Sequence, residues 1–538
     1  MAGMLYVTME PCVSDEGFLS QFTEWYQNEH GPTRLRLPQI FPNGFRYRAT
    51  DGQKPTFLAI YDVTDMAWLE KPIYTDLRAN RSPREAQTIG QVDVNRKFFD
   101  LLASKESSEF VPIDSLTDAE AEGQVLVSVE VSLKAGVEGA EKEVTKWYVE
   151  EHIPMLSKIP GWLRSRVFRT PSVIEGSSEV KIVTLHEYKK ENGLDGAEHK
   201  ASMDTPWRTE VFNKCIDQKS RRTYELFYVF GPGPRELASL SQLPAEAAFE
   251  TADKTISTTP GKDAAVNAFA VAKDGLVIPY RLEGNTSPSA PTVAFSNSLL
   301  TDYHMWDELV KILKAARPDL RVLRYDTRGR HEIPKPFVPA TLDMLADDLK
   351  TVLDALRIPK LHALIGVSMG GATTLKFALK YPGLLEKFIA CDFNVASSDA
   401  NTAAWKDRIA VAEGPDGGIK NLAPVTVERW FHPHTMTEKK DIAQWMTEMV
   451  ARNNVQGFKY SCQALWGYNM REEMKGCTVP GLFVVGDGDG KGALVKAMDG
   501  FKANLGEKGA GLKIVSQAGH LPMSESPKEF WEAIQEFL

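Results

Sequence analysis

One serine of this chain stands between two glycines, in the sequence Gly366-Val367-Ser368-Met369-Gly370. An apolar segment, 361–365, precedes it, and a helix-forming segment, 371–380, follows it. This pattern between a strand and a helix is typical of a tight turn that exposes a nucleophilic serine at the edge of a sheet. Both glycines are needed, because a Cβ at either position would collide with the neighbouring strand or helix. The pattern predicts that Ser368 is a nucleophile; a glycine-rich turn without catalysis is the alternative.

An acid and a base follow this serine in the chain. Asp489 and His520 each come shortly after a segment that we expect to be a parallel strand. The order serine, acid, histidine is that of a nucleophilic triad. We expect His520 to take the proton of Ser368 and return it to the leaving group, while Asp489 holds the imidazole in the required tautomer. Asp392, which follows another expected strand, is the alternative acid.

The oxyanion of such a reaction needs two backbone N–H donors. The N–H of Met369, directly after the nucleophile, is expected to be one of them. The N–H of Leu299, in the polar turn 296–299, is our choice for the other. These groups suffice for acyl transfer, so we expect no metal and no organic cofactor.

Two further sets of residues are candidates for metal ligands or disulfides. His432 and His434 form an H-x-H pair, but no third ligand is evident, so we expect no metal site there. The number of cysteines is odd and none stands in a C-x-x-C pair, which favours buried apolar thiols over a disulfide framework. The cysteines are Cys12, Cys215, Cys391, Cys462 and Cys477.

The elements that must position these residues alternate between strands and helices. Strands are expected at 291–296 and 320–326, and helices at 306–313 and 341–356. The last helix carries a one-sided stripe of leucine and valine residues, which is typical of a helix that covers a sheet. Alternation of this kind predicts an α/β fold with a mainly parallel sheet for residues 265–538.

Five segments of this half carry a family resemblance. They are Ser296-Asn297-Ser298-Leu299, Met305-Trp306-Asp307, Arg324-Tyr325-Asp326-Thr327-Arg328-Gly329, Ile365-Gly366-Val367-Ser368-Met369-Gly370-Gly371 and Gly519-His520-Leu521. With them, residues 265–538 resemble the α/β-hydrolase superfamily and are similar to 3-oxoadipate enol-lactonases. In that family the acid stands three residues after the glycine that closes its strand, which implies Asp489. The family usually continues with His-Gly where this chain has Arg330-His331-Glu332, so the loop near the pocket entrance differs.

Residues from about 395 to 475 lie where such folds insert a helical cap. The segment is rich in aromatic residues, which suit the roof of an apolar pocket. From it we expect Trp405, Trp430 and Trp466 to line a substrate pocket together with Ser298. The alternative is that these aromatic residues form the core of the cap without touching a ligand.

The first half of the chain contains an internal repeat. Residues 25–32 (WYQNEHGP) match residues 147–154 (WYVEEHIP) at a constant offset of 147 − 25 = 122. Each copy has the order strand, helix, strand, strand, helix, strand, which predicts a tandem ferredoxin-like barrel over residues 1–230. This half resembles the dimeric α/β-barrel superfamily, and its EthD-like branch in particular.

Each copy of the repeat contains a glutamate next to a histidine. Glu29 with His30 and Glu151 with His152 are candidate acid/base pairs. However, adjacent helix residues do not face each other, which favours a packing or capping role for the histidines. Members of this superfamily include catalytic and purely structural domains, so the resemblance does not decide between the two roles.

Composition limits the remaining possibilities. Residues 231–264 are rich in Pro, Ala, Ser and Thr and are expected to be a linker between the two domains. The net charge of −9 argues against a nucleic-acid or anionic membrane partner. The N-terminal sequence lacks the pattern of a signal peptide, so we expect a cytoplasmic protein. Exposed barrel edges or sheet faces are compatible with a homodimer.

Together these observations predict an enzyme. We expect a serine hydrolase that cleaves an ester or lactone of a small, mostly apolar metabolite, such as an aromatic or polyketide-type lactone, through an acyl-enzyme. The first alternative is hydrolysis of a C–C bond in a β-diketone or ring-cleavage product by the same triad. The second alternative makes the N-terminal barrel the catalytic or binding unit, as a cyclase or decarboxylase, with the hydrolase half as an accessory.

Overall fold

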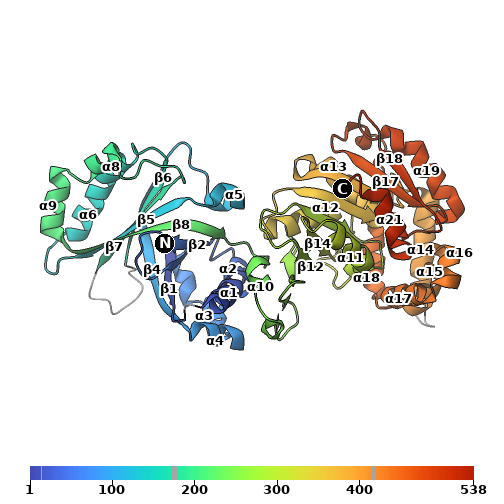
Figure 1. Ribbon diagram of the computed structural model, residues 1–538, viewed down its shortest axis with the longest axis horizontal. Coiled ribbons are helices and arrows are strands. Elements are labelled where there is room, and N and C mark those ends of the chain that lie inside the picture. The colour runs from blue at the N-terminus through green and yellow to red at the C-terminus, as the bar shows by residue number, and fades with distance from the viewer. Residues whose placement is uncertain (14, 171–179, 415–417) are drawn as a thin grey trace. The chain divides into compact units, whose positions relative to one another are not determined.

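A computed structural model describes residues 1–538 except 14, 171–179 and 415–417. The chain divides into two compact units, Met1–Pro234 and Arg235–Leu538 (Figure 1). No helix among the described residues is both long enough and apolar enough to cross a lipid bilayer.

The first unit is built on a closed barrel of eight strands in the order β1-β3-β2-β8-β5-β7-β6-β4. The strands are β1 (Gly3–Pro11), β2 (Phe45–Ala49), β3 (Phe57–Val63), β4 (Val92–Glu106), β5 (Val125–Leu133), β6 (Trp162–Arg169), β7 (Lys181–Tyr188) and β8 (Ile216–Val229). All neighbours are antiparallel, and β4 and β8 each pair with a strand from both copies of the repeat. These two long strands therefore join the copies into one barrel.

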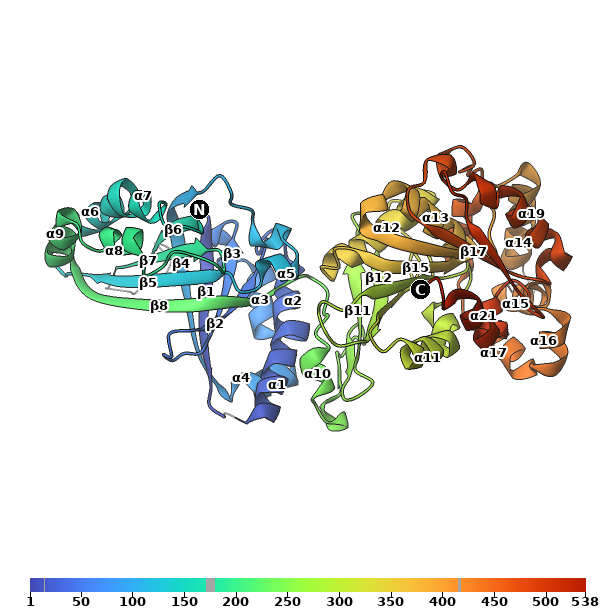
Figure 2. The ribbon, with the colours of Figure 1, turned by 45° about the horizontal axis from the view of Figure 1, so that its top comes forward.

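Helices cover the outside of the barrel in two groups, one from each copy of the repeat (Figure 2). The first group comprises α1 (Glu16–Trp25), η1 (Tyr26–His30), α2 (Gly31–Leu35), α3 (Pro72–Ala79) and α4 (Pro83–Ile89). The second comprises α6 (Ala140–Trp147), η4 (Tyr148–His152), α7 (Ile153–Leu156), α8 (Ala197–Ser202) and α9 (Pro206–Cys215), and a short helix, α5 (Asp118–Ala121), lies between the copies. The repeated motif forms a π-helical turn in both copies, at η1 and η4.

Alternation along the strands gives this unit three separate cores. On β1, Met4 and Tyr6 belong to the core inside the barrel, whereas Leu5 and Val7 pack under the first group of helices. On β5, Val129 packs under the second group. Each copy thus has its own interior between helices and sheet, where a site can differ from that of the other copy.

The second unit contains a ten-stranded sheet in the order β18-β17-β16-β15-β13-β14-β12-β11-β10-β9. The strands are β9 (Phe249–Glu250), β10 (Ser257–Thr259), β11 (Ala265–Val271), β12 (Val277–Gly284), β13 (Thr292–Ser296), β14 (Arg321–Tyr325), β15 (Leu361–Val367), β16 (Leu385–Cys391), β17 (Gly481–Gly486) and β18 (Gly511–Val515). Strands β13 to β18 pair in parallel, and β9 to β12 add antiparallel pairs. The predicted α/β class is confirmed.

Helices cover both faces of this sheet. Helices α12 (Leu342–Ala355) and α13 (Met369–Lys380) contact each other on one face, and α11 (Asp307–Ala316) and α21 (Pro527–Ile534) contact each other on the opposite face (Figure 2). The predicted apolar stripe of α12 is buried, and Thr341 caps the N-terminus of that helix. The parallel strands therefore end along one edge of the sheet between two helical layers.

Residues 235–264, which the sequence analysis assigns to a linker, belong to the second unit. Strand β10 pairs with β11, and β9 pairs with β10, so this segment extends the antiparallel edge of the sheet. The segment has no hydrophobic periodicity because its strands have only two and three residues. Such strands are held by backbone pairing, β10 with β11 and β9 with β10, rather than by a pattern of side chains.

Further helices lie between β16 and β17. They are α14 (Asp399–Glu413), α15 (Gly418–Trp430), α16 (Pro433–Glu438), α17 (Lys440–Ala451) and α18 (Val455–Ser461). The other helices of the second unit are α10 (Ala238–Ser241), α19 (Ala493–Phe501) and α20 (Pro522–Glu525). The region expected to form a cap is thus helical, and α14 and α15 contact each other.

Candidate active site

Ser368 occupies a strained turn between β15 and α13. Its backbone has φ 60° and ψ −117°, a conformation that costs a residue with a Cβ about 1–3 kcal/mol. A Cβ added to Gly366 would lie 2.2 Å from the carbonyl oxygen of Gly370, and one added to Gly370 would lie 2.1 Å from that of Ser296. The predicted need for both glycines is confirmed. The close approach of strand and helix is what forces Ser368 out of the sheet edge.

His520 and Asp489 form a hydrogen-bonded pair beside this turn. Asp489 follows β17 and His520 follows β18, and Nδ1 of His520 lies 2.7 Å from a carboxylate oxygen of Asp489. Burial opposes ionisation of Asp489, but the charge and hydrogen bond of His520 bring the pKa of Asp489 below its usual value. Because the carboxylate accepts, Nδ1 is the donor and Nε2 is left to interact with a hydroxyl or substrate.

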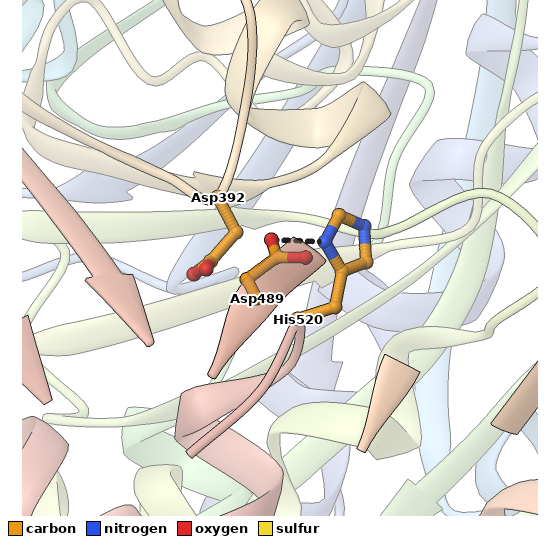
Figure 3. A group of neighbouring side chains, drawn as sticks. All are labelled: Asp392, Asp489 and His520. Atoms are coloured by element: carbon orange, nitrogen blue, oxygen red, sulfur yellow. Dashed lines mark hydrogen bonds and ion pairs between the residues drawn. The ribbon is translucent and has the colours of Figure 1, made fainter. Parts of the chain in front are cut away.

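Asp392, the alternative acid, lies on the other side of Asp489 (Figure 3). It is fully buried, and its Oδ1 accepts a hydrogen bond of 3.0 Å from the backbone N–H of Gly486. Burial, together with the negative charge of Asp489, raises the pKa of Asp392 well above its usual value. These effects favour the protonated form of Asp392, and of the two carboxyl groups the structure pairs Asp489 with His520.

Glu525 connects the histidine segment to the cap. Its carboxylate accepts hydrogen bonds from the backbone N–H groups of Gly519 and His432, at 2.8 Å and 2.7 Å, and from the hydroxyl of Thr435. Burial raises the pKa of Glu525 to about 7. This carboxyl group holds the backbone next to His520, and the sequence analysis did not single it out.

The two expected oxyanion donors lie near the serine. Leu299 lines the same cavity as Ser368, in the turn after β13. Met369 is the first residue of α13, where backbone N–H groups have no partner within the helix. The close packing of Gly370 on Ser296 brings the end of β13 beside the start of α13.

A cavity of about 500 Å³ opens at this site, and Ser368, Asp489 and His520 all line it. Trp405 and Trp430 line it as expected, and the ring of Trp430 stacks on that of His520 with centroids 5.9 Å apart. The structure therefore brings six predicted residues to one cavity: Leu299, Ser368, Trp405, Trp430, Asp489 and His520.

Two predicted pocket residues lie elsewhere. Ser298 is buried and lines a smaller neighbouring cavity with Met369. Trp466 is not among the described residues that line the 500 Å³ cavity; Leu465 and Tyr468, on either side of it, are. The aromatic content of the cap does not show which side chains of a turn face the cavity. Around Trp466, the side chains that do so are those of Leu465 and Tyr468.

Two arginines of the cap also line the cavity and were missed in the sequence. Arg408 of α14 lies with its guanidinium 4.5 Å from the ring centroid of Trp405. Burial lowers the pKa of both arginines, and for Arg429 of α15, where Arg408 adds to the effect, the value is about 10. Neither forms an ion pair within the described part of the chain. The cavity is therefore less apolar than its tryptophans indicate, and two cationic side chains line it.

The H-x-H pair and the two candidate glutamates have structural partners. Nδ1 of His432 accepts the N–H of His434 and caps α16, which accounts for the H-x-H pair. In the first unit, Glu29 accepts from Ser82, and Glu151 accepts from Trp147 at 2.9 Å. Each glutamate is thus bonded away from its adjacent histidine, as expected for neighbours on a helix.

Comparison with known proteins relates the second unit to α/β hydrolases. A family model described as "Alpha/beta hydrolase family" matches residues 295–533. The chain is 31% identical over 263 residues to 3-oxoadipate enol-lactonase 1 of Acinetobacter baylyi, covering 47% of this chain and 91% of that protein. It is 26% identical over 222 residues to a 2-hydroxy-6-oxononadienedioate/2-hydroxy-6-oxononatrienedioate hydrolase of a Pseudomonas species, covering 40% of this chain and 77% of that protein.

A solved structure gives a similar match. The enol-lactonase from Burkholderia xenovorans LB400 covers 50% of this chain and 98% of its own length, at 28% identity and a TM-score of 0.44.

Proposed function

The chain belongs to the α/β-hydrolase family through residues 295–533, and on this premise we propose that it is a serine hydrolase that forms an acyl-enzyme at Ser368. The observation that carries the proposal is the hydrogen bond of 2.7 Å between His520 and Asp489 at the cavity lined by Ser368. A nucleophile on a strained turn beside a carboxylate-paired imidazole is the arrangement that acyl transfer requires.

The proposed steps give each of these groups one role. His520 Nε2 takes the proton of Ser368 as its oxygen attacks the carbonyl carbon, and the N–H groups of Leu299 and Met369 stabilise the oxyanion. His520 then returns the proton to the leaving oxygen, and the C–O bond breaks. Water, activated by the same histidine, adds to the acyl-enzyme and releases the acid and free Ser368.

For the substrate we propose an ester or lactone with a small apolar body that also carries an anionic group. The enol-lactonase relatives support a lactone or a related ester. Trp405 and Trp430 suit an apolar or aromatic body, whereas Arg408 and Arg429 offer charge to a carboxylate. The anionic group is an addition to the mostly apolar substrate expected from the sequence, and the two arginines are the reason.

Product identification with purified protein and a panel of esters and lactones tests the proposal. Hydrolysis of an ester is expected to give one acid and one alcohol, and hydrolysis of a lactone a single hydroxy acid or, from an enol-lactone, a single keto acid. Ser368→Ala is expected to lower kcat by at least about 10⁴-fold. Full activity in the variant would contradict it.

Hydrolysis of a C–C bond is the second candidate, supported by the similarity to a hydrolase of the ring-cleavage type. The same triad would serve it. The products differ, because cleavage of a β-diketone leaves a ketone and a shortened acid and no new alcohol. Mass spectrometry of the products separates the two reactions.

For the first unit we infer a tandem ferredoxin-like barrel of the EthD-like type. The repeated strand order, β4-β1-β3-β2 and β8-β5-β7-β6, and the shared W-Y-x-x-E-H-x-P motif support this inference. The rival hypothesis, in which this barrel is the catalytic unit, predicts that Ser368→Ala in the full chain leaves turnover intact.

A further inference from the structure

A second cavity, in the first unit, lies between the helices and the sheet of the second repeat. Its volume is about 20 Å³, enough for a group of one to a few atoms. Its lining includes three imidazoles and three basic side chains, His152, His186, His199, Arg208, Lys219 and Arg221, together with Tyr148 and Tyr188. Among the described residues that line it, none is an aspartate or a glutamate.

The hydrogen bonds around His186 leave one of its ring nitrogens unpaired. The indole N–H of Trp162 donates to Oγ of Ser165 at 2.9 Å, and that oxygen lies 2.8 Å from Nδ1 of His186. The hydroxyl of Ser165 keeps its own hydrogen when it accepts from Trp162, so it is able to donate to Nδ1. Nε2 of His186 is buried and has no hydrogen-bond partner among the described residues. In the tautomer in which Nδ1 accepts from Ser165, Nε2 carries the ring proton, and a buried N–H of this kind needs an acceptor.

The other two imidazoles line the same cavity. Nδ1 of His199 accepts the backbone N–H of Asp195 at 3.0 Å, so its proton is on Nε2. The carboxylate of Asp195 lies 3.6 Å from the same nitrogen. Nδ1 of His152 is buried and has no hydrogen-bond partner among the described residues. Burial lowers the pKa of His152 to about 3, and the charges of Arg208 and Lys219 act in the same direction. Burial also lowers the pKa values of His186 and His199, so the neutral form of all three rings is favoured.

The positive charge comes from three basic side chains. Within the described residues, Arg208, Lys219 and Arg221 form no ion pair with a carboxylate. Burial lowers the pKa of Lys219, and the two arginines lower it further. Arg208 and Lys219 lie over the same ring, that of Phe212, at 4.2 Å and 5.5 Å from its centroid. A cluster of this kind repels metal cations and attracts anions.

The first repeat provides an internal comparison, because it contains its own anion at the corresponding place. His30, which corresponds to His152 at the offset of 122, has its Nδ1 3.0 Å from the carboxylate of Glu85. Within the part of the chain that the structure describes, the same ring nitrogen of His152 has no hydrogen-bond partner. A carboxylate therefore faces this nitrogen in the first copy, and no described carboxylate does so in the second.

The strand registers extend the comparison. Tyr61 pairs with Leu5 as His186 pairs with Val127, so a tyrosine takes the place of His186 in the first repeat. Its hydroxyl is hydrogen-bonded to that of Tyr26. The imidazole in the second repeat is thus not a requirement of the barrel.

The same registers locate the lysine. Val94 pairs with Met9 as Lys219 pairs with Val131, so the position of Lys219 is apolar in the first repeat. The first repeat thus has the carboxylate of Glu85 and an apolar residue at the position of Lys219. The second repeat has Lys219, and no described carboxylate faces His152 Nδ1.

We propose that the cavity of the second repeat binds a small oxyanion, either an inorganic oxyanion or the carboxylate of a small organic acid. The Nε2–H groups of His186 and His199 donate to it, and Arg208, Lys219 and Arg221 balance its charge. The bound oxyanion takes the part that Glu85 plays in the first repeat. This site is separate from the serine cavity and does not depend on the hydrolase reaction.

Calorimetric titration of the full-length chain tests this site. The chain carries Arg408→Gln and Arg429→Gln, so that the arginines of the serine cavity do not contribute. Sodium acetate and sodium phosphate are titrated in separate experiments, with sodium chloride at equal ionic strength as the reference. Saturable binding of one anion per chain is expected, with acetate the tighter ligand if the site takes carboxylates and phosphate if it takes inorganic oxyanions.

Matched variants locate the binding. Arg221→Gln is expected to weaken it at least about tenfold, because a charge-assisted contact is lost. Lys219→Gln, at a more exposed position, serves as a second variant. Arg96→Gln is the control, since Arg96 pairs with Val7 as Arg221 pairs with Val129. Absence of saturable binding for both anions, or equal weakening by Arg221→Gln and Arg96→Gln, would overturn the proposal.

Discussion

Each unit of this protein contains a cavity lined by histidine, and the two cavities differ in the partner of the ring. In the second unit, Nδ1 of His520 donates to the carboxylate of Asp489. In the first unit, Nδ1 of His186 lies against the hydroxyl of Ser165, and basic side chains surround the ring. A carboxylate stabilises the protonated ring and so makes it a base during turnover, whereas a hydroxyl among cations leaves it a neutral donor. The comparison indicates that the partner of a histidine, rather than the histidine itself, determines its chemistry.

The largest expected effect concerns the carboxylate of the serine cavity. Asp489→Asn is expected to lower kcat by about 10⁴-fold, because an amide at this position favours the wrong tautomer of His520. Asp392→Asn is the matched control: an amide resembles the protonated carboxyl group inferred here, so kcat is expected to fall less than about tenfold. Steady-state kinetics on one ester substrate measures both. Equal losses in the two variants would show that Asp392 shares the role of Asp489.

A smaller effect is expected from the arginines of the same cavity. Arg408→Gln or Arg429→Gln should raise KM for an ester that carries a carboxylate by about 10–100-fold and leave kcat nearly unchanged. KM for a neutral ester of the same size should not change. Lys406→Gln is the control, since Lys406 contacts the ring of Trp466 and not the cavity. A uniform loss on neutral and anionic esters would refute charge recognition.

The cavity of the first unit is expected to respond to a change that leaves hydrolysis intact. Ser165→Ala removes the hydroxyl that orients His186 and should weaken oxyanion binding about fivefold, the value of one neutral hydrogen bond. The rate of ester hydrolysis by the same preparation should equal that of the unmodified chain. A parallel loss of hydrolysis would mean that the two cavities are coupled.

The smallest expected effect is a dependence of stability on pH. The pKa of Glu525 is raised to about 7 from a usual value of 4.5, so its contribution is fully present below about pH 4.5 and is lost as the pH rises through 7. Glu525→Gln cannot titrate, and its Tm should therefore fall less than that of the unmodified chain between pH 5 and pH 8. A difference of about 2–4 °C is expected. Identical pH profiles in thermal unfolding would argue against a protonated Glu525.

The parts of the site that the sequence predicts well are those defined within a few residues. The turn at Ser368 needs only its two glycines and the flanking strand and helix, and the glycine contacts of the structure agree with this reading. The choice of Asp489 came from the family resemblance, in which the acid stands three residues after the glycine that closes its strand, here the end of β17. Both are local features of the end of a strand.

Features that depend on packing between distant segments were not predicted. Arg408 and Arg429 come from two cap helices, and only the contact of α14 with α15 brings their charges to one cavity. Trp466 is one residue away from Leu465, which lines the cavity in its place. The role of residues 249–259 at the sheet edge rests on backbone pairing, which leaves no pattern of side chains.

The central claim is that Ser368 is the nucleophile, and covalent labelling tests it most directly. The intact mass of the full-length protein is measured after incubation with a fluorophosphonate probe, with Ser368→Ala treated in parallel. One adduct is expected on the unmodified chain, on the peptide that contains Ser368, and none on the variant. An unlabelled chain, or the same adduct on Ser368→Ala, would contradict the account.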